Sequence, residues 1–260
     1  MYRSLYTSRT GMNAYQNKLD VISNNLANSQ TDGYKRISTE FESLLKDSLN
    51  GRGVPLSENA GKNLVIGTGI KTGDSIRIWE QGILMTDENP LAIALDGEGF
   101  FGVENPSGDL LLTRNGQFGL SLNGELVNED GYKVAVENEE SLEGWAPEQI
   151  EVTVDGELFV TGTDGEIKSM GSLKLYRTMS QEVLTEVGEG YFLSDENGLE
   201  QIERNKLFET VVRQGFVEKS NVDIGQEMVD MMISQRAYQM NARAVQTADE
   251  MWSLINNMKR

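Results

Sequence analysis

Two heptad repeats of apolar residues, one at each end of the chain, constrain the fold most strongly. The repeats comprise Leu5, Met12, Leu19 and Leu26 near the start, and Ile224, Met231, Tyr238, Val245 and Trp252 near the end. A seven-residue repeat places a narrow apolar stripe along a helix, and such a stripe must be buried against another helix. The pattern predicts terminal helices that pair with each other, with neighbouring molecules, or with both. This arrangement favours assembly over catalysis.

The composition excludes several classes of function. The 260 residues carry a net charge of -18, and most of the acidic excess lies between residues 37 and 223. Nucleic acid is therefore not an expected partner, because binding it depends on lysine and arginine that neutralise phosphates. The chain contains no cysteine and no histidine. Their absence removes Ser-His-Asp and Cys-His nucleophile systems and the usual zinc ligand sets.

The sequence shows neither a membrane span nor a secretory signal. No segment reaches the roughly 18 consecutive apolar residues that a membrane-spanning helix needs. At the N-terminus, Arg9, Asn13, Gln16, Lys18 and Asp20 interrupt any apolar core of a signal peptide. We therefore expect no membrane insertion. If the protein leaves the cytoplasm, we expect it to do so without a cleaved signal peptide.

Local signals predict an α+β fold in which long terminal helices flank a central antiparallel β-rich domain. The first helix is expected over residues 1–28, ended by Thr31-Asp32-Gly33. The last helix is expected from residue 224 to Arg260, with Asp223 as its cap and Gln226 at a capping-box spacing. The predicted divisions are an assembly helix with its signature over 1–36, an arm and glycine-rich linker over 37–69, a β domain over 70–215, and an assembly helix over 216–260.

The region between the helices changes its periodicity. Residues 37–49 are expected as a short helix or an extended arm, and residues 50–69 as a loop. Beyond residue 70, short β-branched and aromatic runs are separated by Asp-Gly and Asn-Gly pairs, which favour tight hairpins. The expected strands are Leu91–Leu95, Phe100–Val103, Glu125–Val127, Ile150–Val154, Glu157–Val160, Leu173–Tyr176 and Tyr191–Leu193.

Both ends of the chain carry recognisable signatures. The N-terminal string comprises Asn24, Asn25, Leu26, Ala27, Asn28, Thr31, Gly33, Tyr34 and Lys35, and the C-terminal string comprises Ser220 to Asp223 and Gln235 to Asn241. Together they resemble the signatures of bacterial flagellar rod and hook proteins. The segments Gln81–Leu84, Leu95–Phe101, Thr113–Phe118 and Asn123–Val127 are similar to the shared central β segments of this family. Chain length and Gly67-Thr68-Gly69 are most similar to the distal rod members, with the proximal rod members as the alternative.

The resemblance implies a structural subunit and not an enzyme. Members of the family polymerise through terminal helices, which form a coiled-coil layer, into a helical tube that transmits motor torque to the hook. The implied partners are copies of the chain itself, other rod and hook subunits, and the flagellar export apparatus. The implied location is the basal-body rod, outside the cytoplasmic membrane, and no cofactor or metal is expected.

The residues that the resemblance and the heptad repeats assign to assembly lie at the two ends. They are Leu5, Met12, Leu19, Asn24, Asn25, Leu26, Asn28, Thr31, Gly33, Tyr34, Lys35, Met231, Gln235, Arg236, Ala237, Tyr238, Asn241, Val245 and Trp252.

Two other readings of the sequence remain open. One is an acidic carbohydrate-active enzyme on a β scaffold, since two carboxylates suffice for glycoside hydrolysis. Its candidate residues are Asp96, Glu98, Asp109 and Glu125. The other is calcium binding at the turn from Asp195 to Gly198, which lacks the full spaced ligand set of a calcium loop.

Overall fold

The computed structural model divides the chain into two compact units. It describes residues 2–43, 46–48, 65–67, 69–137, 142, 144–162, 166–178, 184–188, 190–194, 198–202 and 210–258. Unit 1 comprises Met1–Ala27, Arg36–Ile78 and Val222–Arg260, and unit 2 comprises Asn28–Lys35 and Trp79–Asn221. Each unit therefore gathers segments that are far apart in the sequence.

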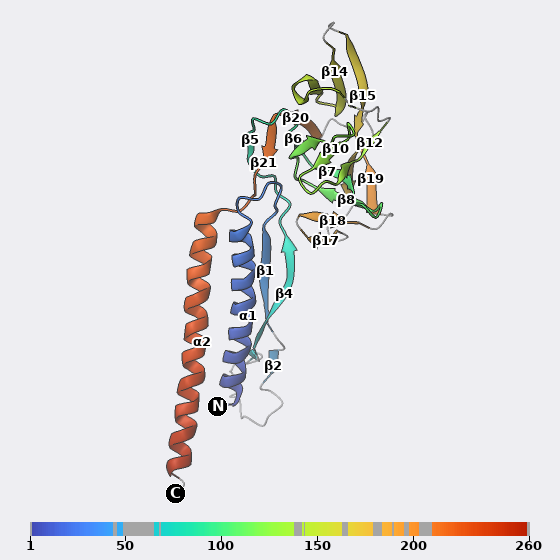
Figure 1. Cartoon of the computed structure of the whole chain (residues 1–260). Helices are drawn as coiled ribbons and strands as arrows, with labels where there is room; N and C mark the ends of the chain where they lie inside the picture. Colours follow the sequence, from blue (N-terminus) through green and yellow to red (C-terminus); the bar gives the residue numbers. More distant parts are fainter. Residues whose placement is uncertain are drawn as a thin grey trace, which may run out of the picture. The chain divides into compact units, whose positions relative to one another are not determined.

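Unit 1 contains both long helices. They are α1 (Tyr2–Ala27) and α2 (Ile224–Met258), and they lie side by side and antiparallel (Figure 1). The expected helices are thus confirmed over the described residues. The cap of α2 is confirmed as well, because the backbone N–H of Gln226 donates to Asp223 Oδ1 at 3.1 Å. The Gln226 side chain instead donates to Asp230 Oδ2 at 3.3 Å, so the capping box is not reciprocal. Neither described helix combines the length and apolarity needed to cross a membrane.

Short antiparallel strands complete unit 1. They are β1 (Ile37–Ser43), β2 (Lys46–Ser48), β3 (Val65–Gly67) and β4 (Ile70–Arg77), with β1 paired to β4 and β2 to β3. The extended alternative for residues 37–49 is therefore confirmed where the chain is described. The expected loop over residues 50–69 is wrong at β3, because backbone pairing with β2 forms a strand there. β1 also packs on α1, where the Tyr15 and Phe41 ring centroids lie 5.1 Å apart.

Unit 2 is built from antiparallel strands. These are β5 (Leu84–Thr86), β6 (Ile93–Gly97), β7 (Phe100–Glu104), β8 (Leu110–Thr113), β9 (Phe118–Leu120), β10 (Leu126–Asn128), β11 (Lys133–Val134), β12 (Val136–Glu137), β13 (Ile150–Val152), β14 (Glu157–Thr161), β15 (Ile167–Leu173), β16 (Leu175–Thr178), β17 (Thr185–Gly188), β18 (Tyr191–Leu193), β19 (Leu199–Gln201), β20 (Thr210–Gln214) and β21 (Phe216–Glu218), with a 3-10 turn, η2 (Pro147–Gln149). The central antiparallel β-rich region is confirmed.

The strands of unit 2 form several sheets in the described residues. The largest has the order β17-β18-β8-β7-β11-β10-β9, and β16 joins it by pairing with β7 and β19. A second sheet has the order β12-β15-β14-β13, and the pairs β20-β6 and β21-β5 complete the set. Aromatic and aliphatic side chains fill the interior, and the rings of Phe101 and Phe118 meet edge to face at 5.1 Å.

Turn chemistry explains the hairpins that the sequence predicted. Gly124, Gly131 and Gly156 have φ angles of 77°, 80° and 77°, in the left-handed region that glycine adopts at low cost. One expected strand, Leu173–Tyr176, is wrong. The chain leaves β15 at Leu173 and begins β16 at Leu175, because Lys174 donates its backbone N–H to Ala135 O between the two strands.

Candidate functional site

The two terminal helices meet within one molecule. A methyl group added at Gly11 of α1 would lie 3.0 Å from the side-chain amide nitrogen of Asn241 of α2. The absence of a side chain at Gly11 therefore lets the two helices approach closely. The buried positions along the described parts of the helices are mostly small or polar: Ser8, Gly11, Ala14, Ile22 and Asn25 on α1, and Glu227, Ser234 and Ala248 on α2.

The residues assigned to assembly from the sequence fall into three groups by burial. Asn25, Gly33, Tyr34 and Lys35 are buried; Leu5, Met12, Leu19, Leu26, Asn28, Met231, Ala237, Tyr238, Asn241, Val245 and Trp252 are half-buried; Asn24, Thr31, Gln235 and Arg236 are exposed. The apolar heptad positions thus flank the tightest contact between the helices. They keep part of their surface available to solvent.

Asn25 joins α1 to the start of β1. Its side-chain oxygen accepts from the Ile37 N–H at 2.9 Å, and its side-chain nitrogen donates to the Ile37 carbonyl at 2.8 Å. The amide group therefore satisfies both backbone groups of Ile37, as a neighbouring strand would. Asn25 is 1% exposed, so both hydrogen bonds are shielded from water. This residue of the N-terminal signature has a structural role inside unit 1.

Gly33 makes a close backbone approach inside unit 2. Its φ angle is 72°, and its N–H donates to the Glu218 carbonyl at 2.7 Å. An added Cβ atom would lie 2.5 Å from the backbone nitrogen of Asn115. Both the backbone angle and the lack of space therefore require glycine at this signature position.

Lys35 is buried against a carboxylate of unit 2. Its Nζ lies 2.5 Å from Glu218 Oε1 and donates to the Glu80 carbonyl at 2.8 Å. The opposite carboxylate oxygen of Glu218 accepts from Arg114 at 3.1 Å. Gly82 also donates its backbone N–H to Glu218 Oε1, at 2.9 Å. We call Lys35, Arg114 and Glu218 the buried charge cluster.

Burial and charge oppose each other within this cluster. The pKa values of Lys35 and Arg114 are both lowered, chiefly because burial disfavours the charged forms. The nearby Glu218 carboxylate acts in the opposite direction and offsets part of this shift. Arg114 donates to the Gly97 carbonyl as well, at 2.8 Å, while its Nε has no partner among the described groups. Lys35 and Arg114 thus share one buried carboxylate, and removing Glu218 would leave both cations without their charged partner in the interior.

A second buried ion pair lies in unit 1, at the residue that follows Lys35. Arg36 Nε lies 2.5 Å from Glu227 Oε1, and Glu227 is fully buried near the start of α2. The Arg36 carbonyl also accepts from the Ile78 N–H at 2.8 Å. Successive basic residues therefore pair with buried carboxylates in the two different units.

The roles of Arg114, Glu218 and Glu227 were not foreseen from the sequence. Glu218 and Glu227 lie among many other acidic residues, and nothing in the local pattern distinguishes a buried carboxylate from a solvated one. Arg114 does lie in the family-like segment Thr113–Phe118, so the resemblance alone could have pointed to it.

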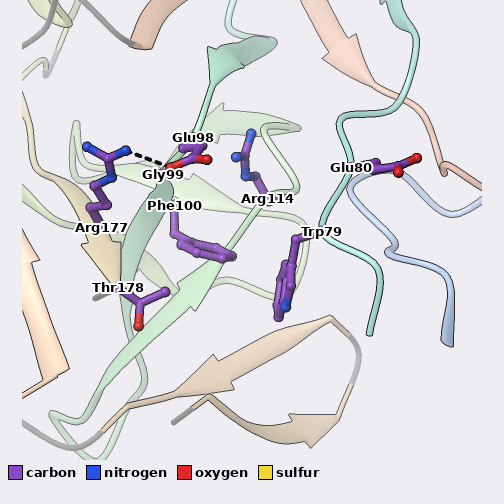
Figure 2. Close-up of a pocket in the computed structure, with 8 residues that line it drawn as sticks. All are labelled: Trp79, Glu80, Glu98, Gly99, Phe100, Arg114, Arg177 and Thr178. Atoms are coloured by element: carbon purple, nitrogen blue, oxygen red, sulfur yellow. Dashed lines mark hydrogen bonds and ion pairs between the residues drawn. The ribbon is translucent and has the colours of Figure 1, made fainter. Parts of the chain in front are cut away.

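Beside the charge cluster, unit 2 contains a cavity of about 340 Å³. Figure 2 shows its lining residues, Trp79, Glu80, Glu98, Gly99, Phe100, Arg114, Arg177 and Thr178. The Trp79 and Phe100 rings meet edge to face at 5.3 Å, and Arg177 pairs with Glu98 at 2.7 Å. Three of the charged groups at this cavity, Glu98, Arg114 and Arg177, are therefore already engaged within the fold.

The candidate catalytic carboxylates also have ordinary partners. Asp96 pairs with Arg213 at 2.7 Å and Glu125 with Lys133 at 2.9 Å. Asp109 accepts from the Asn105 side chain at 3.1 Å within a turn. The calcium alternative at 195–198 falls largely outside the described residues. Among the residues that are described, no cluster of three or more acidic side chains is arranged to hold a metal ion.

Comparisons with known proteins match both ends and the centre of the chain. The family model described as "Flagella basal body rod protein" matches residues 5–35, and "Flagellar hook protein FlgE/F/G D1 domain" matches residues 94–169. A third model, "Flagellar basal body rod FlgEFG protein C-terminal", matches residues 213–258. The terminal matches contain the two signatures, all of α2 and α1 from Leu5 onward.

Similarity to individual proteins extends over the whole chain. The chain is 36% identical to the flagellar basal-body rod protein FlgG of Borreliella burgdorferi, with 100% of both chains covered. It is 32% identical to the protein of the same name from Buchnera aphidicola subsp. Schizaphis graminum, over 99% of this chain and 100% of the relative. The protein of that name from Agrobacterium fabrum is 33% identical, with the same coverage.

Proposed function

Because the chain belongs to the flagellar basal-body rod protein family, we propose that it is a structural subunit of the distal rod that polymerises through its terminal helices. The relatives that it matches along its full length are flagellar rod proteins, so the chain is a structural subunit and not an enzyme. Its partners are copies of itself and other rod and hook subunits.

The observation that supports polymerisation is the apolar surface that α2 leaves uncovered in the single molecule. The exposed apolar residues of α2 are Ile224, Met228, Val229, Met232, Ile233, Met240, Met251, Leu254, Ile255 and Met258. Extended apolar surfaces of this kind mark interaction sites, since exposure to water costs free energy in proportion to area. Methionine suits such a surface, because its flexible side chain adapts to neighbours in different positions.

In the assembled rod, the terminal helices of adjacent copies form a coiled-coil layer. The α1–α2 pair of each copy buries its small residues internally and offers the outer face of α2 to the next copy. The tube built in this way transmits motor torque to the hook. The chain reaches the rod, outside the cytoplasmic membrane, through the flagellar export apparatus.

Charge substitutions on the exposed face of α2 test this proposal. Met228→Asp combined with Met232→Asp places two unpaired carboxylates in the proposed contact, where desolvation opposes assembly. We expect the wild-type chain to form tubes in electron micrographs and the double variant to remain monomeric in analytical ultracentrifugation.

The matched control is Leu122→Asp combined with Ile167→Asp, which adds the same two charges at exposed apolar positions of unit 2, outside α2. It should polymerise as the wild type does. Tubes formed equally well by the Met228/Met232 variant would refute assembly through this face.

A further inference from the structure

A groove runs along the paired helices of unit 1. Its lining residues are Leu5, Tyr6, Arg9, Met12 and Asn13 of α1 and Val245 of α2, and its volume is about 460 Å³. The heptad residues of this set, Leu5, Met12 and Val245, are half-buried and not enclosed. The predicted seam therefore has an open side within the single molecule.

An apolar ridge occupies the far end of α2. Met251, Leu254, Ile255 and Met258 are 45%, 63%, 46% and 87% exposed. Their spacing of i, i+3, i+4 and i+7 places them on one face of the helix, as in helices that bind in apolar grooves. We call these four residues the C-terminal ridge.

The ridge does not enter the groove of its own molecule. Val245 lines the groove, and the ridge continues along the same unbroken helix, α2. At the helical rise, Met258 lies about 20 Å beyond Val245. A continuous helix cannot fold back over that distance, so any ridge that fills the groove must come from another copy.

Length and charge match between the two surfaces. Leu5 to Asn13 spans about 12 Å of helix and Met251 to Met258 spans about 10 Å. Glu250, one helical turn before Leu254 and therefore beside the ridge, is exposed, and so is Arg9 in the groove. No described residue forms an ion pair with either of these two charges. The groove thus offers a free cation where an incoming ridge brings a free carboxylate.

We propose that the C-terminal ridge of one copy binds in the α1–α2 groove of the next copy, with Glu250 facing Arg9. The two surfaces differ, so the contact is heterologous and each bound copy presents a new ridge and a new groove. Copies joined in this way grow into an open, directional polymer. The inference rests on the proposed function, because it identifies the surfaces through which polymerisation occurs.

Cross-linking between two single-cysteine variants tests the contact, since the chain contains no cysteine of its own. Full-length Tyr6→Cys and Leu254→Cys proteins are mixed under polymerising conditions and treated with a short bismaleimide. We expect at least about tenfold more covalent dimer than in a mixture of Leu122→Cys and Leu254→Cys. Two thiols that the proposed contact keeps close together react faster than two thiols that meet only by diffusion. Leu122 lies in unit 2 and is 99% exposed.

Charge reversal provides a second, independent measurement. Arg9→Glu alone should raise the protein concentration needed for polymerisation, and the combination of Arg9→Glu with Glu250→Lys should return that concentration to the wild-type value. Arg243→Glu, an exposed charge change outside both surfaces, is the control.

The outcomes separate this inference from the proposed function. Wild-type polymers that show neither the cross-link nor the charge rescue would overturn the ridge-in-groove contact and leave the rod function standing. A wild-type chain that forms no polymer under any condition would overturn the proposed function itself. Cross-linking together with charge rescue would establish the contact.

Discussion

Lys35 Nζ lies 2.5 Å from a carboxylate oxygen of Glu218, a residue 183 positions farther along the chain. Both side chains are almost fully buried, at 1% exposure each. A lysine of the N-terminal signature is therefore part of the interior of the β-rich unit and not of an exposed assembly surface. The interactions of the signature residues suggest four experiments on the stability of the single molecule.

Lys35→Met should destabilise unit 2. Glu218 would keep Arg114 as its charged partner but would lose a buried hydrogen bond between charged groups, which is worth about 1.5–3 kcal/mol. Urea unfolding followed by near-UV circular dichroism measures the loss. Lys133→Met, which removes a half-exposed pair with Glu125, should cost no more than about 1 kcal/mol. Equal effects of the two substitutions would contradict the role assigned to the buried cluster.

Gly33→Ala should be more harmful than the same change at a glycine with free space. Its Cβ would clash with the backbone of Asn115, and the φ angle adds strain, for a combined cost of about 3 kcal/mol or more. Gly131 has a similar φ of 80° but nothing within 4 Å of an added Cβ. Gly131→Ala should therefore cost only about 1–2 kcal/mol in thermal unfolding. Indistinguishable melting temperatures would argue against the close approach at Gly33.

Asn25→Ala should loosen the start of β1. The substitution leaves the N–H and carbonyl of Ile37 without their side-chain partner, at a cost of about 1–3 kcal/mol for each unsatisfied buried group. Hydrogen exchange of the Ile37 amide, measured by NMR, should accelerate markedly. Gln16→Ala, at an exposed position of the same helix, should leave that amide protected. Unchanged protection in the Asn25 variant would show that other groups hold β1.

Asp223→Ala should weaken the first turn of α2. It removes the side-chain acceptor for the Gln226 N–H, a loss of about 1 kcal/mol for a typical helix cap. Amide exchange in the first turn should rise while exchange near Val245 stays unchanged. Asp223→Ser retains an acceptor and should restore most of the protection. A serine variant as labile as the alanine variant would contradict the cap.

Most secondary structure could be predicted because its signals are local. The heptad repeats identified α1 and α2, and pairs such as Asp155-Gly156 marked the hairpins. Lys174 illustrates the limit. Its backbone N–H donates to the carbonyl of Ala135, 39 positions earlier, and the expected strand is divided there into β15 and β16. No local sequence pattern indicates such a distant partner.

The candidate site was predicted less completely. The apolar stripe at Leu5, Met12 and Val245 was evident from hydropathy, whereas the tight contact at Gly11 and Asn241 was not. Small residues such as Gly11 contribute little to the hydropathy pattern. The periodicity therefore identifies the apolar stripe on the helix but does not show which side of the stripe contacts the partner helix. The assignment of the assembly residues to contacts between copies stays a prediction.

The sequence by itself determined the terminal helices, the antiparallel β-rich centre and the family, since periodicity, turn residues and signature strings are all properties of neighbouring positions. Only the tertiary structure decided that α1 and α2 pair within one molecule, and that Lys35 and Arg36 pair with buried carboxylates in different units. Those outcomes depend on contacts between residues that are at least 183 positions apart. At the surface, water can replace a lost polar partner, so such attractions contribute little. In the interior no water takes the place of the lost partner, so breaking the contact destabilises the fold.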